Sequence, residues 1–261
     1  MISILILHFS YLYSMITKRE IQLFKSLKNK RDRDEHKLFA AETPKLVADF
    51  LRSGARPHSL FVVKDKLNKW KRDFPDYDIA EISNNELDRL SHLKQPHEVA
   101  GLFYKFELPE FRQDALTLVL DRIADPGNMG TLIRTADWFG VKNIICSEDS
   151  ADVYNPKVVQ STMGSLARMN IYYKSAEEIR QMLHPESRIF GADMQGTDLK
   201  NINPGTKDVI LIGSEAHGIQ QFESLCTEML SIPLKKTEGG PESLNAAVAG
   251  SIMLYHFTHA K

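Results

Sequence analysis

The sequence predicts an α/β protein with a smaller amino-terminal α/β domain and a larger carboxyl-terminal domain built on a parallel sheet. Its 261 residues are enough for two domains. A hydrophobic content of 43% and a charged content of 26% are typical of a globular protein with a sizeable core. Short apolar runs of strand length alternate with helix-length segments along most of the chain, which is the pattern of βα units.

The first fourteen residues are apolar but too short to span a bilayer, and they lack the basic segment and cleavage site of a secretory signal. We expect residues 1–14 to be a non-native or disordered extension read from an upstream start codon, with Met15 as the natural start. A membrane anchor is the alternative. Two cysteines, Cys146 and Cys226, provide neither a disulfide framework nor a metal cluster. We therefore expect two buried thiols, no metal and a reducing, cytoplasmic location.

Residues 15–107 are expected to form the smaller domain. It opens with an amphipathic helix over residues 17–30, with Thr17 as N-cap and Glu20 as the capping-box partner. A turn of mixed charge follows at residues 30–37. This stretch is either a solvated linker or a contact for RNA phosphates. The candidate phosphate contacts are Lys28, Lys30, Arg31 and Arg33.

Four strands and three more helices complete this domain. The strands are expected at residues 38–41, 60–63, 77–82 and 99–106, and the helices at 43–52, 66–72 and 86–91, the last capped by Asn84 or Asn85. Residues 108–114 are polar and contain a proline, which indicates a linker to the second domain at 115–261. The first 112 residues hold 20 Lys and Arg against 16 Asp and Glu, and the rest hold 13 against 18. The charge balance therefore suggests that the first part is the one that approaches phosphates.

The second domain is expected to alternate strands and helices, with ligands at the carboxyl ends of its parallel strands. The strands are predicted at residues 115–120, 143–146, 169–173, 188–192 and 209–212, and the helices at 131–139, 156–165, 176–183 and 220–226. A last helix begins at Ser243 as N-cap. Its first residues, 246–250, are small and apolar, so it is either an ordinary buried helix or a segment clamped on all sides by the domain.

The common nucleotide-binding motifs are missing. A dinucleotide site needs Gly-x-Gly-x-x-Gly between a strand and a helix, and the closest approach, residues 125–130, has the wrong spacing. A P-loop lysine is missing as well. Standard dinucleotide and P-loop chemistry is therefore unsupported.

Three segments near predicted strands carry the most informative residues. They are 128–136 (Asn-Met-Gly-Thr-Leu-Ile-Arg-Thr-Ala), 211–218 (Leu-Ile-Gly-Ser-Glu-Ala-His-Gly), and 232–234 (Ile-Pro-Leu) with 243–245 (Ser-Leu-Asn). In order and spacing they resemble the three motifs of the SpoU/TrmH family of RNA ribose methyltransferases, over roughly residues 117–255. Residues 93–102 resemble the end of that family's substrate-binding domain, which is similar to small ribosomal RNA-binding proteins. This chain has Glu42-Thr43 where the family often has Glu-Gly.

The resemblance implies a carboxyl-terminal trefoil knot that binds S-adenosylmethionine in a bent conformation, and a homodimer formed through the knotted domain. The implied catalytic residues are Asn128, Arg134, Glu215, Ser243 and Asn245. The implied cofactor-binding residues, mostly through their main chain, are Leu211, Ile212, Gly213, Gly218, Ile232, Leu234, Ser243 and Leu244. Glycine suits such a role because it lets the backbone approach a flat ring.

In the family the arginine comes from the partner subunit and is proposed to activate the ribose 2′-hydroxyl. A guanidinium hardly deprotonates at neutral pH. We therefore expect Arg134 to grip a phosphate and to stabilise developing alkoxide charge instead. Simpler roles stay open for single residues: Arg134 as a salt-bridge partner, Asn128 and Glu215 as caps, and Trp138 as a core or dimer contact.

The expected function is transfer of a methyl group from S-adenosylmethionine to a 2′-hydroxyl of structured RNA, ribosomal or transfer. The alternatives are a base methyltransferase of the same superfamily, or a non-catalytic RNA-binding or ribosome-assembly protein. Two features depart from the family. Residues 235–242 lengthen one loop, which we expect to be mobile until cofactor or RNA binds, and Ala246-Ala247 stand where valine and serine are common.

Overall fold

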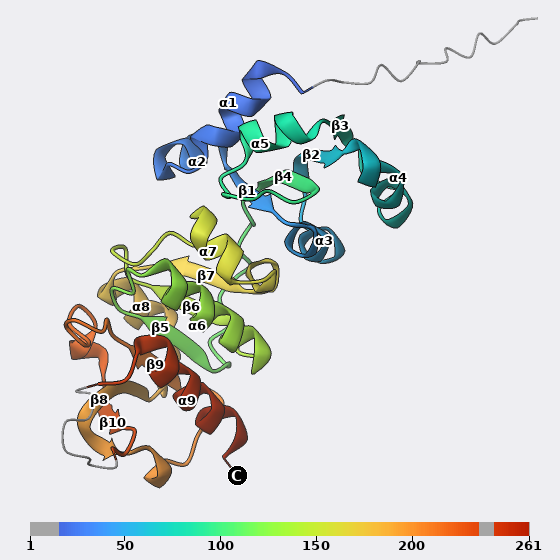
Figure 1. The fold of residues 1–261 in the computed structure, drawn as a ribbon. Coiled ribbons are helices and arrows are strands. Elements are labelled where there is room, and N and C mark those ends of the chain that lie inside the picture. Colours follow the sequence, from blue (N-terminus) through green and yellow to red (C-terminus); the bar gives the residue numbers. More distant parts are fainter. Residues whose placement is uncertain (1–15, 235–242, 261) are drawn as a thin grey trace, which may run out of the picture.

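The computed structural model describes residues 16–234 and 243–260, so the predictions for residues 1–14 and 235–242 lie outside the described residues. Figure 1 shows two units, each built on its own sheet. The amino-terminal sheet has the strand order β1-β4-β2-β3, and the carboxyl-terminal sheet has the order β10-β8-β9-β5-β6-β7. The predicted α/β class is confirmed. No helix within the described ranges is both long and apolar enough to cross a membrane.

The smaller domain is a mixed sheet with helices on both faces. Its elements are α1 (Lys18–Ser26), α2 (Lys30–His36), β1 (Leu38–Glu42), α3 (Pro44–Arg52), β2 (Pro57–Val63), α4 (Lys64–Asp73), β3 (Ala80–Ile82), α5 (Asn84–Leu90) and β4 (Val99–Tyr104). Strand β4 is antiparallel to both β1 and β2, whereas β3 is parallel to β2. Helices α1 and α5 cover one face and α3 and α4 the other.

Local capping signals set several helix ends of this domain. The capping box of α1 is confirmed, because Thr17 Oγ1 accepts the Glu20 N–H and Glu20 Oε2 accepts the Thr17 N–H. The expected cap of α5 is wrong by one residue: Ser83, not Asn84, forms a capping box with Glu86. Ser83 is favoured because it lies three residues before Glu86, which is the spacing that a capping box requires.

The predicted turn at residues 30–37 is wrong, because this stretch is helix α2. It begins after Asn29, whose side chain donates to Asp32, and it ends at Lys37 in a left-handed conformation with φ 55°. A seven-residue helix is too short to be stable alone, so its formation depends on tertiary contacts. Such contacts join residues that are far apart in the sequence, so the local pattern did not predict this helix.

Thr43 adopts a backbone conformation that favours glycine. It lies between β1 and α3 with φ 81° and ψ 142°. A β-branched residue is strained at positive φ. This is the position at which the resembled family often carries glycine, so the departure seen in the sequence has a conformational cost.

The larger domain alternates strands and helices around a fully parallel six-stranded sheet. Its elements are β5 (Thr117–Leu120), α6 (Pro126–Trp138), β6 (Asn143–Cys146), α7 (Pro156–Ser161), η1 (Ser165–Arg168), β7 (Asn170–Tyr173), α8 (Ala176–Met182), β8 (Ile189–Asp198), η2 (Leu199–Asn201), β9 (Val209–Ile212), η3 (Glu223–Leu225), β10 (Glu228–Ser231) and α9 (Ala246–His259). All neighbouring strands run in the same direction. Strands β5, β6 and β9 are buried along their whole length, as expected where both faces of a parallel sheet are covered.

Several predicted boundaries in this domain need correction. Helix α6 starts at Pro126 instead of residue 131, because Asp125 Oδ1 accepts the Asn128 N–H and proline suits the first helical position. The helix expected at residues 220–226 is only the short η3. The strand expected at 188–192 continues to Asp198 as β8, where β10 pairs with it. Strand β10 itself was not predicted.

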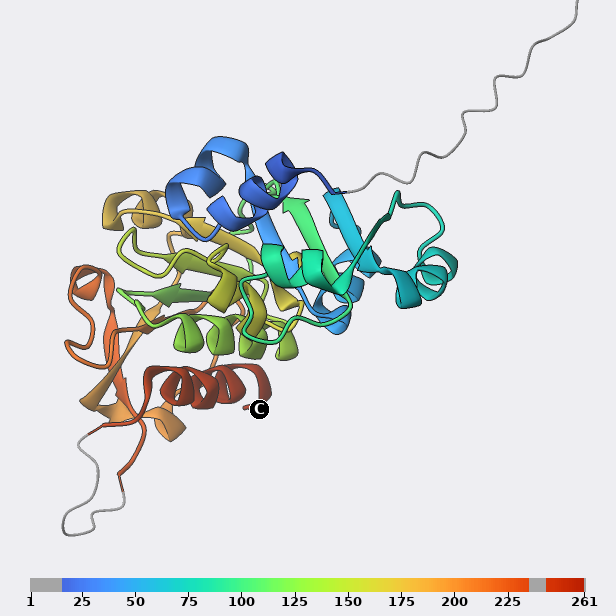
Figure 2. The same cartoon turned by 45° about the horizontal axis from the view of Figure 1, so that its top comes forward.

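The last helix begins later than predicted and is not clamped on all sides. Asn245, not Ser243, is its N-cap, with Oδ1 accepting the N–H groups of Ala247 (3.0 Å) and Val248 (3.2 Å). Figures 1 and 2 both show α9 lying beside α6. A side chain at Gly250 would meet Leu132, so this face needs a small residue. The opposite face leaves Val248, Ile252 and Tyr255 exposed.

The two domains share a buried junction. Arg33 is only 2% exposed, and its guanidinium donates to Asp152 Oδ2 of the larger domain at 2.6 and 3.0 Å and to the Leu27 carbonyl at 2.7 Å. Tyr154 Oη accepts the Phe106 N–H, and its ring lies 5.0 Å from that of Phe39. The prediction of Arg33 as a phosphate contact is therefore wrong, because the junction already occupies its side chain.

Candidate active site

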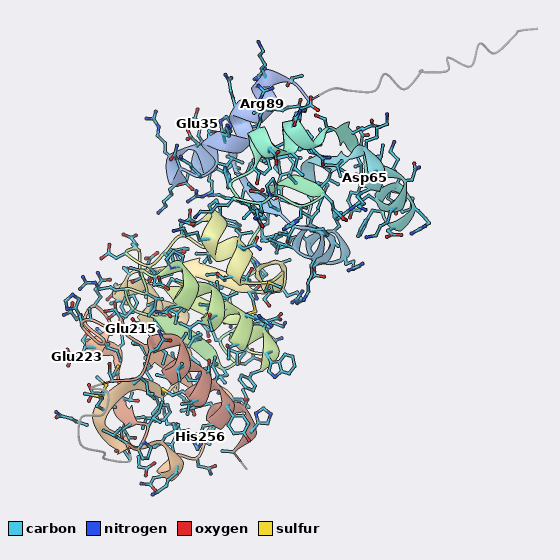
Figure 3. The ribbon with its side chains drawn as sticks, viewed as in Figure 1. Glu35, Asp65, Arg89, Glu215, Glu223 and His256 are labelled. Atoms are coloured by element: carbon cyan, nitrogen blue, oxygen red, sulfur yellow. The ribbon has the colours of Figure 1, made fainter. Side chains whose placement is uncertain are left out.

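Three of the segments singled out in the sequence meet at the carboxyl edge of the large sheet. They are the first turn of α6 after β5, the loop after β9 and the residues at the start of α9. Since parallel strands place their carboxyl ends at one edge, residues from distant motifs are brought together there. Figure 3 shows Glu215 at the margin of the larger domain, well away from Glu35 and Asp65 of the smaller one.

Asn128, Glu215 and Asn245 form one hydrogen-bonded cluster. Asn128 Nδ2 donates to Glu215 Oε1 at 3.1 Å, and Asn245 Nδ2 donates to Asn128 Oδ1 at 2.9 Å. Asn245 Nδ2 also contacts Glu215 Oε1, which in addition accepts the Ala246 N–H at 3.2 Å. The carboxylate thus lies at the amino-terminal end of α9, where the helix dipole favours negative charge.

This geometry decides between the roles that the sequence left open. Asn128 does not cap α6, since Asp125 does so, and its side-chain amide is directed to Glu215. Asn245 is a cap and a cluster member at once, because Oδ1 serves the helix and Nδ2 serves the cluster. Glu215 also caps, but it does so across the site by accepting the first N–H of α9.

The loop that carries Glu215 is folded tightly on itself. The backbones of Ser214 and Gly218 exchange two hydrogen bonds, of 3.0 and 2.8 Å. A Cβ on Gly213 would lie 2.1 Å from the Gly218 carbonyl carbon, so the fold of this loop requires glycine at position 213. Gly218 has φ 63° with open space beside it. Both glycines were expected to let a ligand approach the backbone. Gly218 has open space for this, whereas the space beside Gly213 is filled by the chain.

The other predicted cofactor-binding residues surround this loop to different degrees. Leu211 and Ile212 are buried in β9, so only their main chain can reach a ligand. Ile232 is half-buried, and Leu234 is exposed. Ser243 and Leu244 are exposed just before α9, and no hydrogen bond of the Ser243 hydroxyl occurs within the described residues.

Arg134 stands apart from the cluster. It lies on α6 six residues after Asn128, which is roughly 9 Å along the helix and about 240° around its axis. Its side chain is exposed and makes no ion pair within residues 16–234 and 243–260. The simple role of a salt-bridge partner within the described chain is thus not seen. The structure brings together three of the five predicted catalytic residues and directs Arg134 elsewhere.

A groove of about 450 Å³ runs between α6 and α9 and ends at the cluster. Its lining comprises Asn128, Thr131, Phe139, Asn245, Ala247, Val248, Ser251, Ile252 and Tyr255. Trp138, which ends α6 and precedes the lining residue Phe139, is 83% exposed. The sequence interpretation did not single out Val248, Ile252 and Tyr255, although their spacing places them on one face of a helix.

Neither of the two cysteines is suited to act as a nucleophile. Burial raises the pKa of the Cys146 thiol far above its usual range and that of Cys226, which is half-buried, to about 11. No group of three or more His, Cys, Asp or Glu in the part of the chain that the structure describes is arranged to hold a metal ion. Lys28, Lys30 and Arg31 are exposed at the corner between α1 and α2 of the other domain.

These features define a two-domain α/β protein with a candidate site at the carboxyl edge of a parallel sheet. The chain belongs to the SpoU rRNA Methylase family. The model of that family matches residues 115–255, and a model described as an MRM3-like substrate binding domain matches residues 18–101. The family predicted from the sequence is confirmed.

Characterised relatives extend this similarity over most of the chain. A 23S rRNA (guanosine(2553)-2′-O)-methyltransferase of Bacillus subtilis is 26% identical over 91% of this chain and 95% of its own length. A 23S rRNA (uridine(2479)-2′-O)-methyltransferase of Streptomyces viridochromogenes is 30% identical over 79% of this chain and 81% of its own. The crystal structure of an AdoMet-bound rRNA methyltransferase from Sinorhizobium meliloti superposes with a TM-score of 0.82 at 26% identity, covering 94% of this chain and 97% of that one.

Proposed function

We propose that the protein transfers the methyl group of S-adenosylmethionine to a ribose 2′-hydroxyl of ribosomal RNA. The observation that carries this proposal is the convergence of Asn128, Glu215 and Asn245 from three separate motifs. The named activities of the two 23S rRNA relatives support the ribose oxygen as the acceptor. Since those relatives modify different nucleotides, the position on the RNA is not part of the proposal. Action on transfer RNA and a cytoplasmic location stay predictions.

The residues at the sheet edge fit a cofactor with a flat base. Open space beside Gly218, at a positive φ, gives an adenine ring access to main-chain groups. The residues that would hold it are Leu211, Ile212, Gly213, Gly218, Ile232, Leu234, Ser243 and Leu244. S-adenosylmethionine would supply a methyl group bonded to a positively charged sulfur, which makes the methyl carbon electrophilic. In the AdoMet-bound relative the same fold holds this cofactor.

The chain's own side chains would position the acceptor. Glu215 accepts hydrogen bonds from the start of α9 and from the side chain of Asn128, so the cluster fixes α6, the loop after β9 and α9 relative to one another. Arg134 would grip an RNA phosphate and stabilise the negative charge that develops on the 2′-oxygen. The 2′-hydroxyl would release its proton to solvent on accepting the methyl group. Alignment of the two reacting atoms supplies much of the reduction in barrier.

A second copy of the chain is part of this proposal. Trp138, Val248, Ile252 and Tyr255 form an exposed apolar face on α6 and α9, and Arg134 lies on the same side of α6 as Trp138. A homodimer through this face would cover it and would bring Arg134 to the partner's cluster. We further propose that the segment ending in α9 passes through the chain to make the predicted trefoil knot. The packing of α9 against both α6 and β9 is consistent with it.

The smaller domain is proposed to bind the RNA. The chain then divides into an RNA-binding domain at residues 15–107, a linker at 108–114 and a catalytic domain at 115–261. Lys28, Lys30 and Arg31 are exposed and are the candidate phosphate contacts that the structure leaves available. The substrate binding family model over residues 18–101 supports this assignment.

Nucleoside mass spectrometry of ribosomal RNA tests the reaction. RNA from cells with and without the gene should differ by one 2′-O-methylated nucleoside, and purified protein with S-adenosylmethionine should restore it. Gain of a methylated base would support the base methyltransferase instead. Unchanged RNA together with tight RNA binding would support a non-catalytic role.

A further inference from the structure

A buried carboxylate lies at the same sheet edge but outside the cluster described above. Asp121 directly follows β5 and is 0% exposed. Its Oδ2 accepts the backbone N–H groups of Gln220 (2.6 Å) and Phe222 (3.3 Å), whereas Oδ1 has no hydrogen-bond partner among the described residues. Burial of a charged group is costly, and backbone donors offset only part of that cost here. The position thus calls for a physical explanation.

Asp121 ties together both ends of the loop that carries Glu215. Its own N–H donates to the carbonyl of Ile212, the last residue of β9, at 2.8 Å. Its carboxylate holds residues 220 and 222, where the chain returns to the sheet. Glu215 lies between these two attachment points. One residue therefore fixes where the loop leaves β9 and where it comes back.

The neighbouring residue strengthens this attachment. Arg122 has a left-handed backbone with φ 57°, and its N–H donates to Ser147 Oγ at 2.8 Å. Its guanidinium contacts the side-chain oxygen of Gln220. Strained conformations of this kind persist where the surrounding structure enforces them, often beside functional sites. Residues 121 and 122 thus connect the carboxyl ends of β5, β6 and β9.

We propose that Asp121 is a positioning residue for S-adenosylmethionine. Its carboxylate preforms the 213–222 loop, so that the open side of Gly218 and the main chain after β9 are already in place when the cofactor arrives. This inference rests on the proposed function, because it concerns the loop assigned there to the cofactor. A preformed loop lowers the ordering cost of binding.

The test compares two buried aspartates at opposite ends of the same region. Asp208 is 3% exposed and precedes β9, and its carboxylate accepts the Gly205 N–H at 2.6 Å and the guanidinium of Arg188 at 2.7 Å. Asp121→Asn should weaken S-adenosylmethionine binding in calorimetry by about tenfold, since a neutral acceptor binds N–H groups less strongly. Asp208→Asn should lower thermal stability at least as much and leave cofactor affinity unchanged. RNA affinity should stay at the wild-type value in both variants.

Three outcomes would overturn the inference. The first is equal cofactor affinity of wild type and Asp121→Asn, which leaves the proposed function intact. The second is loss of affinity in both variants in proportion to their loss of stability, which is the sign of a general structural role. The third applies even if Asp121→Asn does not fold: in the cofactor-free wild type, hydrogen exchange at the amides of Gln220 and Phe222 should be slow, and fast exchange contradicts a preformed loop. Absence of binding by the wild type would instead reject the proposed function itself.

Discussion

The junction between the domains and the face formed by α6 and α9 are built in opposite ways. At the junction, the buried Arg33 guanidinium is paired with Asp152 and donates to the Leu27 carbonyl, and the rings of Phe39 and Tyr154 lie 5.0 Å apart, so polar groups are satisfied and apolar groups are covered. On the α6–α9 face, Trp138 is 83% and Tyr255 58% exposed, and Arg134 projects nearby without an ion pair in the described part of the chain. Large exposed apolar patches of this kind mark interaction sites.

The contacts of the domain junction are all made within one chain, whereas the α6–α9 face is left exposed. Buried contacts join the smaller domain to the larger one, whereas the α6–α9 face leaves large apolar side chains exposed. A fixed smaller domain and an exposed α6–α9 face both suit the proposed homodimer, in which each subunit would supply Arg134 to the other's site.

The largest effect is expected at the junction. Asp152→Ala leaves the Arg33 guanidinium buried without its partner, which should cost about 3–5 kcal/mol in the free energy of unfolding. Urea denaturation measures this. Asp114→Ala is the matched control, because its pair with Arg112 is exposed, and its midpoint should equal that of the wild type. Equal midpoints for both variants would mean that the junction is not a fixed contact.

On the open face, Arg134→Ala should reduce methylation by about 10²–10³-fold while cofactor affinity is kept. Mixing this variant with Asn128→Ala distinguishes the source of the guanidinium. If Arg134 acts on the partner's site, mixed dimers hold one intact site each, and activity should return to about a quarter of the wild-type value. Mixtures that stay inactive would place Arg134 in its own subunit's site.

Dimer formation should depend on the exposed apolar side chains. Trp138→Glu should weaken the dimer by about 2 kcal/mol, which is roughly thirtyfold in its dissociation constant. Analytical ultracentrifugation over a range of concentrations measures the shift. Leu108→Glu, at an exposed leucine of the linker, provides the comparison and should not change the oligomeric state. Wild-type protein that sediments as a monomer at all concentrations would contradict the assignment of this face.

The smallest effect is expected away from both regions. Thr43→Gly removes strain at φ 81° and should raise stability by about 1 kcal/mol without changing activity or assembly. Gly54→Thr is the mirror change, because Gly54 has φ 78° with no atom nearby, and it should lower stability by a similar amount. Differential scanning calorimetry compares the two. A lower melting temperature for Thr43→Gly would show that the threonine side chain makes contacts worth more than the strain.

The sequence was sufficient for features that depend on local chemistry. The capping box of Thr17 and Glu20, the buried central strands and the order of βα units all follow from short-range patterns. The start of α6 could also have been found, because Asp125-Pro126 is a strong helix-start signal. The motif segments were recognised through resemblance, and three of their five predicted catalytic residues, Asn128, Glu215 and Asn245, lie together.

Features that depend on distant partners could not be read from the sequence. The residues around Arg33 in the sequence predict a solvent-exposed side chain. Its burial depends on Asp152, which lies 119 residues away. Ser243 and Asn245 are both good N-caps, and the choice between them follows from the contact of Asn245 with Asn128 across 117 residues. Strand β10 is short and forms by pairing with β8. The role of Asp121 likewise appears only when the loop returns to it.

The double use of Asn245 links the start of a helix to the assembly of the site. Its Oδ1 accepts N–H groups at the start of α9, and its Nδ2 donates to Asn128. Unwinding of the first turn of α9 would therefore also separate Asn128 from Glu215. The stability of one helix end and the integrity of the cluster are thus the same property.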